Sequence, residues 1–255
     1  MLRYAISLVV VSIVGMAAFC GGGSASPTPV SDEEFRAAAE AAVTASLLTL
    51  NDLPAAWVGT PPEPDEDDPA GDAAFRDALS PACQGYADLF DDSGGDYPGA
   101  AFEMESDTFE PENTDGPADD ISSDAAAFRA VEDLNAEWDE VVNFVRDCGD
   151  EMPEAMRRAF ATDPDFDGVE LTKLEFRQAD APAIGDRAAR WEMEMAFSTQ
   201  GFEFDATVVS TGIQSGRMIG SVTWTDFGSF DTTLGESLTA LVAERLQKAN
   251  EVLPE

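Results

Sequence analysis

The chain contains no histidine, only two lysines and only three cysteines in 255 residues. Without histidine, the common Ser-His and Cys-His arrangements for nucleophilic catalysis cannot form, and a cysteine-based metal site lacks the residue to complete it. No G-x-S-x-G motif and no glycine-rich phosphate loop occurs either. We therefore expect a protein without enzymatic activity and without a bound organic cofactor.

Basic residues are scarce as well, because 14 Lys and Arg face 51 Asp and Glu, for a formal net charge of -37. This balance excludes nucleic acid as a partner, since phosphate binding needs Lys and Arg, and it disfavours anionic membrane surfaces. Residues 63–120 hold 19 of the acidic residues and a single basic one. We predict a solubilising surface with acidic loops near residues 61–72 and 110–120.

Long apolar runs are absent except near the N-terminus, where Arg3 precedes an uncharged, largely apolar run over residues 4–19. A basic residue before an apolar run too short to span a membrane is typical of a secretory signal peptide. We predict a signal peptide over residues 1–19, a flexible tether over 20–30 and one globular domain over 31–255.

The sequence Ala-Ala-Phe-Cys at residues 17–20 resembles the lipobox of bacterial lipoproteins, in which the cysteine becomes the lipid-bearing first residue of the mature chain. The resemblance implies lipidation of Cys20 and a location on the outer face of the cell membrane. Family members carry a small residue before the cysteine, and this chain carries Phe19. Signal cleavage after Ala25 and retention of the apolar run as an anchor remain alternatives.

Removal or lipidation of Cys20 leaves Cys83 and Cys148, an even number in an exported and oxidising setting. We therefore predict a disulfide bond between Cys83 and Cys148. The alternative is a pair of buried free thiols.

Apolar residues alternate with polar ones over residues 189–199 and again over 202–208, as in half-buried strands. A two-residue loop between them would place Phe197 opposite Phe204, with Met195 opposite Ala206 and Met193 opposite Val208. A third strand over 217–227 follows a turn at residues 212–216. A helix capped by Asp231 closes this meander.

Earlier in the chain, a capping box at Ser31 predicts a helix to about residue 48, and residues 73–79 predict a short helical turn. We expect a long helix that Ser123 caps and Gly149 ends, a short helix over 152–162, and strands over 102–108 and 169–176. This order predicts an α+β fold with a mostly antiparallel sheet of about five strands, a C-terminal three-strand meander, and helices packed on one face.

The sequence Leu-Leu-Thr-Leu-Asn-Asp-Leu-Pro-Ala-Ala-Trp at residues 47–57 resembles the opening of exported sensor-type lipoproteins of actinobacteria. These are similar to the extracellular sensor domain of the mycobacterial PknH-type kinases, and the later order of elements fits over residues 47–253. The resemblance implies a sensor-like domain that binds an unknown ligand in a cleft. The family domain has two disulfides, whereas this chain can form one.

The sharpest local motif is Asp163-Pro-Asp165-Phe-Asp167-Gly168, which matches positions 1, 3, 5 and 6 of a calcium-binding loop. Position 12 is Leu174 instead of the bidentate glutamate, so the competing interpretation is an ordinary acidic turn. The motif thus makes Asp163, Asp165 and Asp167 candidate ligands of a calcium ion.

One predicted face of the meander gathers carboxylates and two arginines: Glu192, Glu194, Glu203, Asp205, Arg190 and Arg217. Such carboxylates could hold a divalent metal for hydrolysis, or they could form cross-strand ion pairs on a wet sheet face. The tryptophans on predicted apolar faces fit the core better than a ligand platform: Trp138, Trp191 and Trp224.

The sequence thus predicts an exported, lipid-anchored cell-envelope protein that binds a small ligand or another envelope protein without chemistry. A carboxylate/divalent-metal hydrolase and a calcium-stabilised structural surface protein are the alternatives.

Overall fold

The computed structural model describes residues 30–62, 69–85, 97, 99–112, 118–162, 168–199 and 201–254. The elements follow the chain as α1 (Asp32–Ser46), the 3-10 turn η2 (Leu50–Asp52), β1 (Trp57–Thr60), α2 (Pro69–Ala78), β2 (Phe102–Glu105), β3 (Thr108–Pro111), β4 (Asp120–Ala127), α4 (Val131–Cys148), α5 (Met152–Thr162), β5 (Val169–Ala179), β6 (Arg187–Thr199), β7 (Phe202–Ser215), β8 (Met218–Asp226) and α6 (Thr232–Val252). The predicted signal peptide, Cys20, and the three aspartates of the calcium motif lie outside the described residues.

The strands form one eight-stranded sheet in the order β1-β3-β4-β8-β7-β6-β5, and β2 also pairs with β4. The pairs between these strands are antiparallel. The α+β class is confirmed, with more strands than the five expected. The predicted hairpin register is also confirmed, since Phe197 pairs with Phe204 and Met195 with Ala206.

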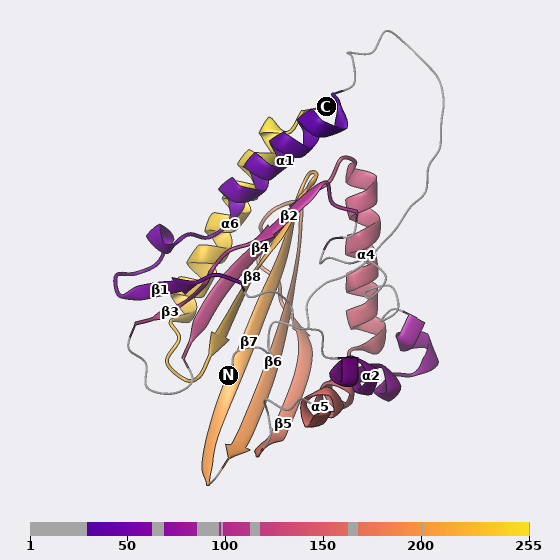
Figure 1. Ribbon diagram of the computed structural model, residues 1–255, viewed down its shortest axis with the longest axis vertical. Helices are drawn as coiled ribbons and strands as arrows, with labels where there is room; N and C mark the ends of the chain where they lie inside the picture. Colours follow the sequence, from indigo (N-terminus) through magenta and orange to yellow (C-terminus); the bar gives the residue numbers. More distant parts are fainter. Residues whose placement is uncertain are drawn as a thin grey trace.

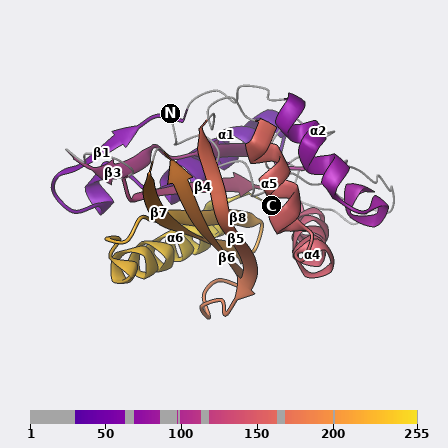
Figure 2. The same ribbon diagram turned by 90° about the horizontal axis from the view of Figure 1, so that it is seen from below.

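Helices cover both faces of the sheet, which corrects the prediction of one covered face. α1 and α6 lie side by side against one face, whereas α4 lies on the other (Figure 1). Figure 2 shows α6 and the group α2, α4 and α5 on opposite sides of β6 and β7. Along β7, Val209 and Ile213 join the core under α1 and α6, whereas Ala206 and Val208 join the core under α5. The central strands are apolar on both sides because each side carries a helical layer.

Residues 120–127 form the central strand β4, so the prediction that Ser123 caps the long helix is wrong. β4 pairs with β8 along its length, from Asp120 opposite Thr225 to Ala127 opposite Met218. The Ser123 hydroxyl instead accepts a hydrogen bond from the Leu48 backbone N–H at 2.9 Å. The long helix, α4, begins only at Val131, and Gly149 is its C-cap as predicted.

Other helix ends agree with the local signals in the sequence. The capping box at Ser31 is present, because the Glu34 N–H donates to the Ser31 hydroxyl at 3.2 Å and the Ser31 N–H donates to the Glu34 carboxylate at 3.1 Å. Asp231 caps α6 by accepting from the Thr233 N–H at 2.9 Å. α2 begins at Pro69, inside the predicted acidic loop.

Several strand boundaries differ from prediction. β7 runs through Gly212 to Ser215, so the turn into β8 lies at residues 216–217, where Gly216 has a φ of +58°. The strand predicted over 102–108 is divided into β2 and β3, and the loop predicted over 110–120 begins inside β3. β5 is longer than predicted, and its irregular phase is a register shift between Leu171 and Lys173.

Candidate functional site

A narrow slot lies between α4 and the sheet. Its volume is about 20 Å³, which is room for little more than one water-sized group. The slot exists because two indoles face bare backbone: a Cβ added at Gly212 would lie 3.5 Å from Trp191 and 3.7 Å from Trp138. The residues that line it are Tyr97, Glu137, Trp138, Val141, Val142, Trp191, Gly212, Ile219, Gly220 and Ser221.

Glu137 is the buried carboxyl group of the slot, with 1% of its surface exposed. Burial, together with the nearby carboxylates of Glu103 and Glu140, raises the pKa of Glu137 to about 9. The side chain is therefore uncharged at neutral pH. Among the residues that the structure describes, none makes a hydrogen bond to Glu137 Oε1.

The indole of Trp191 supplies a second polar group without a partner. Trp191 is 7% exposed, and no acceptor within the described ranges reaches its Nε1–H. Trp138 supplies the other indole of the slot. The guanidinium of Arg187 lies over this ring, 5.3 Å from its centroid. Arg187 also forms an ion pair with Asp139. One aromatic wall of the slot is thus already in contact with a cation.

Asp124 on β4 binds two of the residues that line the slot, Tyr97 and Ser221. The hydroxyl groups of Tyr97 and Ser221 each donate a hydrogen bond to one of its carboxylate oxygens. Burial raises the pKa of Asp124, against the effect of these hydrogen bonds. The Tyr97 N–H donates to the Glu103 carboxylate at 2.8 Å, so Tyr97 connects Glu103 to Asp124.

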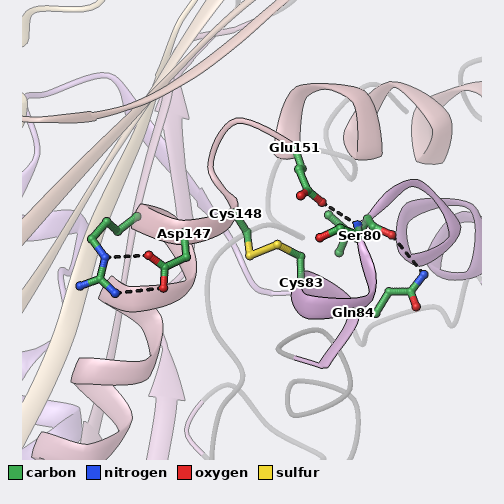
Figure 3. The surroundings of a disulfide bond; sticks show 8 residues. Ser80, Cys83, Gln84, Asp147, Cys148 and Glu151 are labelled. Carbon is green, nitrogen blue, oxygen red and sulfur yellow. Dashed lines mark hydrogen bonds and ion pairs between the residues drawn. A yellow bond between two sulfur atoms is a disulfide. The ribbon is translucent and has the colours of Figure 1, made fainter.

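Cys83 and Cys148 are joined in the predicted disulfide bond, and both side chains are buried (Figure 3). The bond links the helical residues 81–85 to the last residue of α4. Next to it, the Ser80 N–H donates to the Glu151 carboxylate at 2.6 Å. The disulfide therefore fixes the C-terminal end of the helix that forms one wall of the slot.

The acidic face of the meander is a surface of cross-strand ion pairs. Lys173 lies 2.7 Å from Glu194, and Arg177 contacts Glu192. These pairs join β5 to β6, with side chains that are partly open to solvent. Within the described ranges, no group of three or more Asp, Glu, Cys or His is placed to hold a metal ion.

The two arginines assigned to that face have other roles. Arg190 contacts Glu236 of α6 at 2.7 Å, whereas Arg217 donates to the carbonyl groups of Leu253 and Pro254 at 2.9 Å. The predicted grouping of Arg217 with the acidic face is therefore wrong. The turn between β7 and β8 carries Arg217 to the end of α6 instead.

Trp224 is buried in the core as predicted and stacks on Phe230 at 5.9 Å between centroids. Trp138 and Trp191 are also core residues, but they line the slot. Sequence reasoning missed Glu137, although a signal was present: Glu137 lies three residues after Leu134 and four before Val141, on the apolar seam of α4.

The helices of the described residues include none that is long and apolar enough to cross a membrane. No family model matches the chain, and no curated protein matches its sequence.

Two solved structures from Mycobacterium tuberculosis are similar to this chain. The extracellular domain of PknH has 12% sequence identity and a TM-score of 0.41, over 87% of this chain and 98% of that chain. LpqN, which is involved in cell envelope biogenesis, has 8% identity and a TM-score of 0.24, over 55% of this chain and 69% of that chain.

Proposed function

We propose that the chain is an exported, lipid-anchored protein of the cell envelope whose domain binds a small ligand or a partner protein without catalysing a reaction. The single observation that carries the binding function is the slot under α4, whose open lining is almost entirely apolar and includes the side chains of Trp138, Val141 and Trp191. Removal of apolar surface from water contributes roughly 25 cal/mol per Å², so a small apolar group that fills this slot would be held favourably.

Export and anchoring are supported by the sequence before residue 30. The basic residue, short apolar run and cysteine at position 20 have the order of a lipoprotein signal. The disulfide between Cys83 and Cys148 suits an oxidising compartment outside the cytoplasm.

The binding function is tested by a variant that fills the slot. In Gly212→Ala the new methyl group meets its neighbours at ordinary contact distances of 3.5 Å or more, so the fold should be retained. A panel of small molecules, each with an apolar group, is screened against the mature protein, and a binder raises the melting temperature according to its concentration and Kd. Binders should lose this effect in Gly212→Ala. If every binder acts equally on both proteins, the slot is not the binding site.

Anchoring is tested by mass spectrometry of the mature N-terminus. We expect diacylglycerol on Cys20, and we expect Cys20→Ser to release the protein from the membrane. A mature chain that begins at Ser26 would contradict the lipid anchor and leave export intact.

A further inference from the structure

We infer, resting on the proposed partner-binding function, that the end of the β6–β7 hairpin docks on another envelope protein, at an apolar pocket bordered by Lys and Arg. Phe202 is the anchor of this docking surface. It lies about 33 Å along β7 from Gly212, so the surface is separate from the slot under α4.

Phe202 is an aromatic side chain left in water. It is 74% exposed, the highest fraction among the large apolar side chains of the described residues. It begins β7 directly after Gly201, and it lies in one row with Val169 and Thr199 across β5, β6 and β7. Covering such a ring removes apolar area from water, and aromatic side chains are enriched in the cores of protein interfaces.

The strand end that carries Phe202 rests on packed aromatic rings. Phe204, on the same face of β7, stacks on Phe197 with the ring centroids 5.0 Å apart. Phe197 in turn contacts Phe160 of α5 at 6.4 Å, and Phe204 contacts Phe227 at 6.3 Å. A phenylalanine has only two side-chain torsions, so Phe202 on this base loses little conformational freedom when it enters a pocket.

The opposite face of the same hairpin end carries exposed carboxylates. Glu170 and Glu203 lie in one row across the three strands, and Asp205 follows two residues along β7. Among the described residues, none forms an ion pair with any of these three. Lys173, in the row of Asp205, is paired with Glu194 at 2.7 Å instead. A basic protein surface complements this end, whereas an anionic lipid surface is repelled by it.

The hairpin end lies at the opposite end of the molecule from the start of α1 and the C-terminus (Figure 1). Beyond the other end of β7, the guanidinium groups of Arg129 and Arg217 lie over Phe35 of α1, at 4.9 and 5.5 Å from its ring centroid. The 14 residues of β7 span about 45 Å between these ends. An anchor at Cys20 would therefore attach to the end remote from Phe202 and leave the hairpin end open to neighbouring proteins.

Photocrosslinking in cells that export the full chain tests this surface. The photoreactive amino acid p-benzoyl-phenylalanine takes the place of Phe202, or of Val252 as the matched control. Val252 is an apolar side chain of α6 with 72% exposure near the C-terminus. We expect position 202 to crosslink to one protein that position 252 does not reach. The crosslinked peptide should lie in an apolar pocket with Lys or Arg at its border.

The crosslinked protein is then purified, and its binding to variants of this chain is measured. Phe202→Ala should raise the Kd at least about thirtyfold, as the loss of an interface anchor does, and Val252→Ala should not change it. Glu203→Lys should slow association, most strongly at low salt. Gly212→Ala, which fills the slot, should bind this protein as the wild type does.

The other outcomes overturn the inference. Crosslinks to lipid alone would make the hairpin end a membrane contact, and a crosslinked dimer would make it an interface between two copies of this chain. The inference is also wrong if position 202 gives no crosslink that position 252 lacks, if the crosslinked pocket has no Lys or Arg, or if Phe202→Ala leaves the Kd unchanged. None of these results changes the outcome of the slot test with Gly212→Ala, so the two failures are distinguishable.

Discussion

Glu137 should make the stability of this protein fall as the pH rises through the neutral range. The pKa of a glutamate in an unfolded chain is about 4.3, whereas burial raises the pKa of folded Glu137 to about 9. Between these values the folded protein holds a proton that the unfolded chain has lost. The contribution of Glu137 to the free energy of unfolding is therefore highest below about pH 4.3, decreases as the pH rises, and levels off above about pH 9.

The size of the effect follows from the pKa difference. Between the two pKa values, each pH unit lowers the free energy of unfolding by about 1.4 kcal/mol. At pH 7 the contribution of Glu137 is therefore about 3 to 4 kcal/mol smaller than at pH 4.3. The glutamine in Glu137→Gln cannot ionise, so this variant lacks the pH dependence that Glu137 contributes. Relative to wild type, the variant should therefore gain about 3 to 4 kcal/mol between pH 4.3 and pH 7, on top of any constant difference caused by the new amide.

The assay is urea denaturation of both proteins at a series of pH values, with the difference in unfolding free energy plotted against pH. Burial also raises the pKa of Asp124 and of Glu140, but both groups are present in both proteins and largely cancel in the difference. Glu251→Gln, an exposed change on α6, is the matched control and should run parallel to wild type. A difference between wild type and Glu137→Gln that does not change between pH 4.3 and pH 7 would refute the reasoning.

Three further predictions concern the disulfide bond, the glycines Gly212 and Gly220, and the negative charge of the chain. Cys148→Ser should lower the free energy of unfolding by about 4 kcal/mol, because the bond joins residues 65 positions apart, and thiol labelling of the mature wild type should find Cys83 and Cys148 unreactive. Gly220→Ala should lower the melting temperature, since the added Cβ would lie 2.6 Å from the Asp124 carbonyl oxygen, and Gly212→Ala should not. Sodium chloride should raise the melting temperature gradually, because it screens the repulsion between carboxylates. Calcium at matched ionic strength should add only a small, non-saturating rise. A saturable rise with calcium that is lost in Asp165→Ala would instead establish a calcium site.

Local interactions made much of this fold readable from the sequence. The alternation along β6 and β7 and the two-residue loop between them define one register, because a shift by one residue would turn every apolar side chain to the opposite face. The caps Ser31 and Asp231 mark where α1 and α6 begin, since each accepts from a backbone N–H only two or three residues away. The disulfide followed from the even number of cysteines that remain after export.

Three features could be recognised only from the tertiary structure: the strand β4, the second helical layer and the slot. Residues 125–127 are three alanines, which favour a helix in isolation, but they form a strand because pairing with β8 and β2 buries them completely. The second helical layer escaped prediction because β6 carries Glu192 and Glu194 on one face, which suggested an entirely wet side of the sheet.

Glu137 shows the same limit at the site. Its position on the seam of α4 can be read from the sequence, but its pKa depends on burial and on Glu103, which is 34 residues earlier in the chain. Gly212 and Trp191 likewise form the slot only because β6 and β7 stand side by side beneath α4. The sequence determined which side chains are apolar, capped or paired through nearby residues. Only the packing of distant elements decided which carboxyl group became buried and uncharged.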